Sequence, residues 1–177
     1  MGLPKNALGV CTLSAALLLG AYFAQSSTAP SLRPKAERAD RVLVQKPDRR
    51  LTLYRANQVL KTYQVALGGA PVGHKQKQGD QKTPEGKYVI DWRNAKSQFY
   101  LSLHISYPNA ADRARARKAG VDPGGDIMIH GLGKGLGWVG AAHRNRDWTL
   151  GCIAVTNEEI EEIWGLVPNG TPIEIRP

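Results

Sequence analysis

The stretch DWTLGCIAVTN, residues 147–157, places a cysteine directly after a glycine and before a short apolar run. The sequence holds two cysteines, and the other, Cys11, lies in an apolar N-terminal segment. Cys152 is therefore the only cysteine of the remaining chain, so it has no intramolecular disulfide partner there. An isolated cysteine is most simply interpreted as a small buried hydrophobic residue. A reactive thiol has to be argued from the residues around it.

The first 29 residues differ in composition from the rest of the chain. Lys5 precedes an apolar run over residues 7–24 that contains no acidic residue. This pattern is typical of a signal peptide or an N-terminal membrane anchor. It predicts export to the periplasm or cell envelope, with membrane contact only through this segment. Residues 30–40, rich in proline and charge, are expected to be a linker, and residues 41–177 form one domain.

The chain carries a formal net charge of +9. Its basic residues are scattered, apart from one local cluster at Arg113, Arg115, Arg117 and Lys118. Nucleic-acid binding would call for basic and aromatic residues interleaved on one element, and export also argues against it. We therefore expect no nucleic acid and favour an anionic envelope polymer or membrane surface as partner, although a solvated basic face remains the default interpretation of the cluster.

Alternating polar and apolar residues predict a domain built mainly from β-strands. The pattern marks strands within residues 41–46, 50–55, 59–69, 83–92, 99–107, 126–131 and 171–176. Two short helices are expected. One covers residues 109–119 and stops at Gly120, and the other covers 157–166, where Thr156 and Glu159 form a capping box. Since strands and helices do not alternate, we predict an antiparallel, β-sandwich-like domain with two short helices.

Catalysis by a thiol needs a nearby base, because a free thiol with a pKa near ~8.5 is mostly protonated at neutral pH. Four histidines precede Cys152, and His130 is the best candidate because it ends a predicted buried strand just before Gly131. His74 and His143 lie in predicted loops, and His104 fits a core histidine better. A base beside the thiol leads us to expect an accessible Cys152 with a lowered pKa. No acidic third partner is assigned.

Neither a metal nor a cofactor is expected from the sequence. His130, His143 and Cys152 could in principle meet, but they lack tight ligand spacing. The glycine-rich GLGWVG at 135–140 matches a dinucleotide-binding pattern, yet no helical pattern follows it, so we interpret it as a loop.

Three blocks in a fixed order carry a more specific resemblance. They are Thr83-Pro84-x-Gly86, Ile129-His130-Gly131 and Thr149-x-Gly151-Cys152. Together they resemble the L,D-transpeptidase catalytic domain of the YkuD family over roughly residues 41–176. The resemblance implies a β-rich cysteine enzyme that acylates its thiol with the third residue of a peptidoglycan stem peptide. The acyl group then passes to an amine, in cell-wall cross-linking or protein attachment.

The resemblance also implies roles for residues. Cys152 is the expected nucleophile and His130 the expected base. Gly131, Thr149 and Gly151 are expected to support the turn that aims the thiol and to help form an oxyanion site. Gly151 would in addition leave room for an acyl carbonyl that approaches the sulfur.

The chain departs from the family pattern close to the cysteine. Leu150 stands where many members have a histidine, and Ala154 stands where many have an arginine. The run GCIAVTNEEIEEIW at 151–164 is similar to a subgroup that includes a hydrolase releasing lipoprotein from peptidoglycan. The acceptor therefore stays open between a stem amine, a lysine of an envelope protein and water. Two alternatives to a transpeptidase remain. One is an L,D-peptidase or amidase, and the other is a non-catalytic wall-binding module.

Overall fold

The computed structural model describes residues 1–2 and 29–177 of the chain. The apolar segment in which we predict a signal peptide or membrane anchor lies outside the described residues. Within the described residues, no helix is both long and apolar enough to cross a membrane.

One curled sheet contains the eight strands found among the described residues, in the order β3-β2-β1-β8-β4-β5-β6-β7. Most neighbouring strands are antiparallel, but the β1/β8 and β6/β7 pairs are parallel. The mainly antiparallel β fold predicted from the sequence is therefore confirmed. The strands are β1 Arg41–Gln45, β2 Arg50–Arg55, β3 Gln58–Gln64, β4 Gly86–Ser97, β5 Tyr100–Ile105, β6 Met128–His130, β7 Ile153–Ala154 and β8 Pro172–Arg176.

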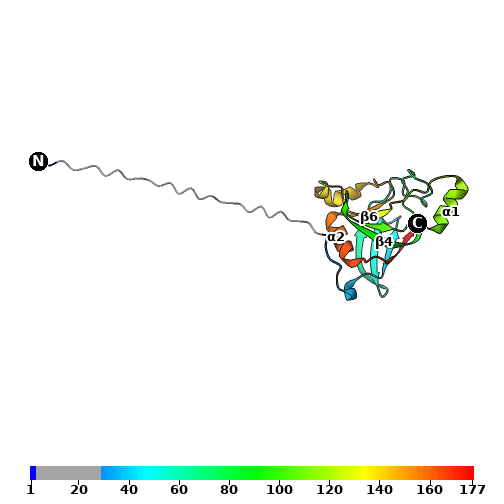
Figure 1. Ribbon diagram of the computed structural model, residues 1–177, viewed down its shortest axis with the longest axis horizontal. Coiled ribbons are helices and arrows are strands. Elements are labelled where there is room, and N and C mark those ends of the chain that lie inside the picture. Colours follow the sequence, from blue (N-terminus) through cyan, green and yellow to red (C-terminus); the bar gives the residue numbers. More distant parts are fainter. Residues whose placement is uncertain (3–28) are drawn as a thin grey trace.

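Both predicted α-helices are present, α1 at Ala110–Ala119 and α2 at Asn157–Leu166. They lie on opposite sides of the strands (Figure 1). The capping box predicted for α2 is formed, because Thr156 Oγ1 accepts a hydrogen bond from the backbone N–H of Glu159 and the Glu159 carboxylate accepts one from the backbone N–H of Thr156. Gly120 ends α1 in the left-handed conformation, with φ of 66°, as a C-terminal glycine commonly does.

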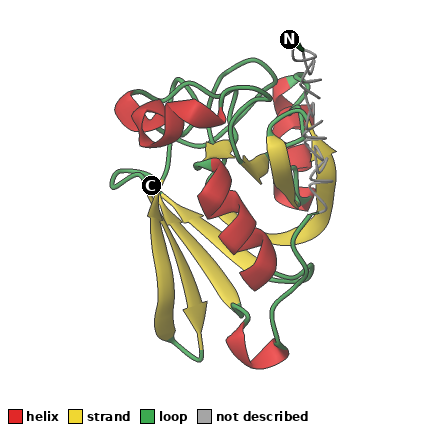
Figure 2. Cartoon of the chain, turned by 90° about the vertical axis from the view of Figure 1, so that its left-hand side faces the viewer, coloured by secondary structure: helices red, strands yellow, loops and turns green. Residues whose placement is uncertain are grey.

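Two short 3₁₀ segments were not expected from the sequence. One, η1 at Lys35–Glu37, falls in the predicted linker, and the backbone of Ala39 bonds to Leu166 at the end of α2. The other, η2 at Gly137–Asn145, is kinked at Gly140, whose φ is 49°, and begins within the stretch interpreted as a glycine-rich loop. Figure 2 shows the long loops gathered at one end of the sheet.

The hydrophobic core extends to the strands that position His130 and Cys152. Ile129 in β6 and Ile153 in β7 are in-register partners, and both are fully buried. Burying a side chain of this size stabilises the fold by about 1.5–3 kcal/mol. These two isoleucines therefore hold the residues next to them, His130 and Cys152, on a rigid part of the sheet.

Candidate active site

His130 and Cys152 are brought together by two parallel strands. His130 is the last residue of β6, and Cys152 directly precedes β7, whose Ala154 pairs with His130. Both side chains line one cavity of about 470 Å³. The two residues that the sequence singles out thus share a single surface depression, which Phe99, Asp126, Trp148 and Leu150 also help to line.

The imidazole of His130 is held in one orientation. Its side chain is buried, with only 3% of the residue exposed. Nδ1 lies 2.6 Å from the carbonyl oxygen of Gly131. A carbonyl only accepts hydrogen bonds, so Nδ1 carries the ring proton and Nε2 keeps its lone pair. The rings of Phe99 and Trp148 flank the imidazole, with centroid distances of 4.4 and 5.9 Å.

Burial keeps this ring neutral. Removal from water lowers the pKa of His130 to about 4, and the Gly131 carbonyl only partly opposes that effect. At neutral pH the side chain is therefore an uncharged imidazole with a free lone pair on Nε2. This is the form that a general base requires.

Cys152 is a free, half-buried thiol. Its Sγ lies 3.5 Å from the carbonyl oxygen of Asp126, to which the S–H group donates. Burial raises the pKa of this thiol, so the lowered value expected from the sequence is wrong. The physical reason is that a poorly solvated site disfavours the thiolate and the imidazolium alike. The resting pair is a thiol and a neutral imidazole.

The turn before Cys152 is closed by a threonine. Thr149 Oγ1 donates to the carbonyl of Cys152 at 2.8 Å and accepts from the N–H of Gly151 at 3.1 Å. The Gly151 N–H is thus already engaged inside the turn. The N–H of Cys152 is a donor of this turn that could serve an oxyanion.

The structure gives a packing reason for a glycine at position 151. Its φ is 134°, a conformation that side chains rarely adopt. A Cβ there would lie 2.7 Å from the carbonyl oxygen of Lys82 and 3.1 Å from Ile127. The protein's own packing therefore requires a glycine at this position. At Gly131, which has no positive φ, a Cβ would lie 2.7 Å from Asn157 Oδ1.

One wall of the cavity comes from the polar loop at residues 73–81, which showed no pattern in the sequence. Lys75 is buried there, and its Nζ donates to Asp80 at 2.8 Å and to the carbonyl of Lys77. Burial alone would raise the pKa of Asp80, but hydrogen bonds from Lys75 and three backbone N–H groups outweigh it and lower the pKa to about 2. This buried ion pair was missed because a run of polar residues gives no periodic signal.

The remaining histidines lie outside this cavity. His74 contacts Asp112, and His104 stacks on Trp92 while its Nδ1 lies 2.6 Å from Asp91. His143 is buried in η2 and lines a different cavity. Across the described residues, no three His, Cys, Asp or Glu side chains are grouped closely enough to hold a metal ion.

The two departures from the family pattern have different surroundings. Leu150 is 72% exposed and lines the cavity beside Cys152. Ala154 is fully buried in β7, where its backbone N–H donates to Ala66 at 2.8 Å. The position at which many members carry an arginine is therefore part of the core in this chain.

A thiol and a neutral imidazole that line one cavity of a mainly β domain define a cysteine–histidine site of the kind used in acyl transfer. The family model of the L,D-transpeptidase catalytic domain, YkuD, matches residues 39–175. The chain belongs to this family.

A curated relative, the putative L,D-transpeptidase YafK of Escherichia coli K12, is 34% identical over 128 residues. The match covers 69% of this chain and 44% of YafK, so the chain spans less than half the length of that relative. The fold resembles that of the helical cell shape determining protein Pgp2 of Campylobacter jejuni, with a TM-score of 0.58 and 23% identity over 84% of this chain and 51% of Pgp2. It also resembles an L,D-transpeptidase of Mycobacterium smegmatis, with a TM-score of 0.52 and 12% identity over 78% of this chain and 59% of the other.

Proposed function

We propose that this protein is an exported cysteine enzyme that acts on peptidoglycan stem peptides as an L,D-transpeptidase. Cys152 is the nucleophile and His130 is the base. The observation that carries the proposal is the shared cavity of Cys152 and a neutral His130, whose Nδ1 is tied to Gly131 and whose Nε2 is free to accept a proton. Family membership supplies the substrate class.

In the acylation step, Sγ of Cys152 bonds to the carbonyl carbon of the third stem residue, a diamino acid. The thiol proton passes to Nε2 of His130, and the N–H of Cys152 stabilises the oxyanion. The C–N bond to the fourth residue then breaks, and the departing amine takes the proton from Nε2. A thioester on Cys152 remains, and His130 is neutral again.

In the second step, an acceptor amine attacks the thioester carbonyl. His130 removes a proton from that amine and returns it to the sulfur as the C–S bond breaks. The products are a new amide and the free thiol. A stem amine gives a cross-link, and a lysine of an envelope protein gives an attached protein.

The charge of the protein is consistent with an anionic wall substrate. The net charge is +9. The proposal includes export by the N-terminal segment and a catalytic domain over residues 41–177. It involves neither nucleic acid nor a cofactor.

Hydrolysis is the second candidate because Cys152 is half-buried, so water can also reach a thioester there. An enzyme that uses water in the second step is an L,D-peptidase, and the acylation step is unchanged. Leu150, the exposed neighbour of Cys152, lines this cavity.

The test is a product analysis. The full chain is incubated with a tetrapeptide stem as donor and a rising concentration of a diamino-acid acceptor, and products are separated by mass spectrometry. We expect amide product to rise with acceptor at the expense of the free acid. Free acid at every acceptor concentration would replace the transferase with an L,D-peptidase. If turnover is no greater than that of the Cys152→Ser variant, the protein is a non-catalytic wall-binding module.

A further inference from the structure

The segment around η2, residues 134–146, presents an apolar surface to solvent. Trp138 is 83% exposed and Leu136 is 50% exposed, although both side chains are large and hydrophobic. The stretch GLGWVGAA at 135–142 contains no polar side chain, and none of its residues is buried. Exposed hydrophobic residues are common one at a time, but a continuous exposed stretch marks an interaction site. We call residues 134–146 the η2 surface.

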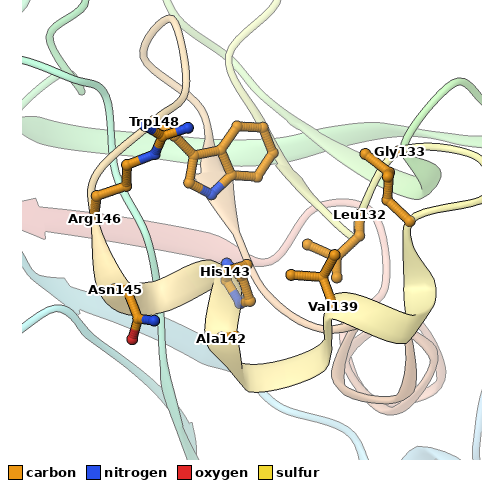
Figure 3. Close-up of a pocket in the computed structure, with 9 residues that line it drawn as sticks. Leu132, Gly133, Val139, Ala142, His143, Asn145, Arg146 and Trp148 are labelled. Carbon is orange, nitrogen blue, oxygen red and sulfur yellow. The ribbon is translucent and has the colours of Figure 1, made fainter.

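The apolar character continues behind η2. Figure 3 shows η2 and Trp148 on opposite sides of a cavity of about 460 Å³, with Leu132 and Val139 directed into it. Leu136 and Ala142 line the same cavity. Because Leu136 is also exposed, the cavity and the η2 surface form one apolar region at this end of the domain.

Basic residues flank the apolar stretch. Residues 127–146 include Lys134, Arg144 and Arg146 and no acidic residue. Arg144 pairs with Glu159 of α2. Lys134 and Arg146 are exposed, and neither forms an ion pair within the described part of the chain. Cations beside apolar side chains suit a partner that is anionic at its surface and apolar beneath it.

The η2 surface adjoins the start of the described domain. Lys134 lines a cavity of about 370 Å³ together with Ala29 and Pro30. Figure 1 shows the blue segment that leads to η1 and the segment η2 at the same left-hand end of the domain. The apolar run predicted to be a signal peptide or membrane anchor ends at residue 24. An extended chain covers at most ~3.6 Å per residue, so a run inserted in a bilayer would keep Ala29 within about 18 Å of it.

A lipid bilayer fits this surface better than a glycan does. Sugar hydroxyls need hydrogen-bonding side chains around them, because an unmade hydrogen bond costs free energy. Residues 135–142 supply no such side chain. Tryptophan, by contrast, is enriched at the boundary between lipid headgroups and acyl chains, and lysine and arginine are attracted to anionic lipids.

We propose that the η2 surface docks on an anionic phospholipid bilayer. Leu136 and Trp138 enter the headgroup region, while Lys134 and Arg146 contact lipid phosphates. The sequence predicts membrane contact only through the N-terminal segment, so the η2 surface adds a second contact.

Docking of η2 also positions the catalytic cavity. Trp148 follows Arg146 by two residues and lines the Cys152 cavity, so docking holds that cavity near the bilayer. This contact goes beyond the proposed acyl transfer and does not depend on acylation of the thiol.

The test measures whether the indole of Trp138 reaches lipid. The full chain is mixed with vesicles of phosphatidylglycerol and phosphatidylcholine that carry bromine on their acyl chains, and tryptophan emission is compared with that in the same lipids without bromine. Bromine quenches an indole only at close range. Residues 1–28 contain no tryptophan, so insertion of the apolar run adds no signal of its own.

We expect bromine-dependent quenching in the parent and its loss in Trp138→Phe. The matched control is Trp92→Phe, because Trp92 is also exposed, at 40%, but lies in β4 outside the η2 surface. Emission of this variant should be quenched as in the parent. Both changes keep an aromatic ring at an exposed position, so both variants are expected to fold.

The cations are tested by Lys134→Gln and Arg146→Gln. A cation close to an anionic bilayer contributes about fivefold, so each change should lower the ratio of docked to undocked protein by about that factor. Arg117→Gln is the control for general charge, because Arg117 is exposed on α1, at the other end of the domain (Figure 1). Vesicles of phosphatidylcholine alone, or raised ionic strength, should reduce quenching of the parent in the same way.

Three results would overturn the inference. They are equal bromine-dependent quenching in the parent and Trp138→Phe, equal quenching in anionic and neutral vesicles, and equal effects of Arg117→Gln and Arg146→Gln. Co-sedimentation with insoluble peptidoglycan tests the wall as the alternative partner. If Trp138→Phe weakens co-sedimentation and leaves bromine quenching unchanged, Trp138 contacts the wall polymer and the inference fails.

Acylation of Cys152 is measured separately, by the mass of the intact protein. A protein that docks on anionic vesicles but forms no thioester loses the proposed function alone. One that forms a thioester while Trp138 stays unquenched loses this inference alone.

Discussion

The Nδ1 atom of His130 lies 2.6 Å from the carbonyl oxygen of Gly131, which leaves Nε2 as the ring nitrogen that can accept a proton. The backbone of the next residue thus orients the imidazole, where many cysteine and serine enzymes use a carboxylate. A neutral carbonyl adds no negative charge, so it does little to raise the pKa of the ring. Burial therefore dominates, and the ring stays neutral far below pH 7.

The acylation rate should depend on pH in an unusual range. The pKa of His130 is lowered to about 4, so the base is lost only when pH falls through that value. We expect the rate of Cys152 acylation by a tetrapeptide donor to be constant from about pH 6.5 to 5 and to drop near pH 4, in single-turnover measurements. A half-maximal rate near the ordinary histidine pKa of ~6.5 would contradict a buried neutral base.

The resting thiol should react slowly with an alkylating reagent. Because burial raises the pKa of Cys152, its thiolate fraction at pH 7 is smaller than that of a free thiol, whose pKa is ~8.5. We expect iodoacetamide to modify Cys152 more slowly than N-acetylcysteine at pH 7, with the rate rising in alkaline solution. Faster modification than the reference at pH 7 would indicate a thiolate–imidazolium pair.

Replacement of histidines separates the base from its neighbours. His130→Ala should lower the acylation rate by about 10²–10⁴-fold, the usual range for a positioned general base. His104→Ala is the control, because His104 does not line the Cys152 cavity. His143→Ala should likewise retain acylation at a saturating donor concentration. An equal loss of acylation rate in His143→Ala and His130→Ala would contradict the assignment of His130 as the base and would point to His143 in η2.

The turn before the thiol should not tolerate a side chain. Gly151→Ala introduces both an unfavourable φ and a contact of 2.7 Å with the Lys82 carbonyl. Gly170→Ala is a matched control, since Gly170 also has a positive φ, of 88°, but nothing lies within 4 Å of its Cβ position. We expect the free energy of unfolding in urea to fall at least ~1 kcal/mol further for Gly151→Ala. Equal losses would show that the contact relaxes without cost.

The loop beside the thiol should be sensitive to acid through Asp80. Its folded pKa of about 2 is below the ordinary value, so its stabilisation is complete above about pH 4 and is lost as pH falls toward 2. Asp80→Asn should remove about 2 kcal/mol of stability at pH 7, because it also leaves the buried Lys75 without its carboxylate. The variant should lack the loss of stability between pH 4 and 2. The free energy of unfolding measured against pH decides this, and identical curves would contradict the assignment.

Local signals in the sequence predict the strands and helices well. The capping box of Thr156 and Glu159 and the terminal Gly120 depend only on neighbouring residues. α2 begins and α1 ends where those residues indicate. The parallel pairing of β1 with β8 is a contact between distant segments, and periodicity carries no information about it. The two-residue strand β7 is too short to show any alternation.

The site is predicted in part. The three motif blocks identify Cys152 and His130, and the structure brings both to one cavity. Their electrostatics were not predictable, because the direction of each pKa shift depends on burial by residues such as Phe99 and Trp148, which the motifs do not include. The buried Lys75 and His143 come from polar or glycine-rich stretches, where composition gives no sign of a buried side chain. The N-terminal signal and the domain boundaries stay predictions.

The central claim is that Cys152 becomes acylated by a stem peptide. The most direct measurement is the intact-protein mass of the full chain after brief mixing with a tetrapeptide donor in the absence of acceptor, followed by digestion to locate the adduct. We predict an added mass equal to the tripeptide acyl group on the peptide that contains Cys152, and no adduct on Cys152→Ser. Consumption of donor without any adduct on Cys152, or an equal adduct on Cys152→Ser, would contradict the account.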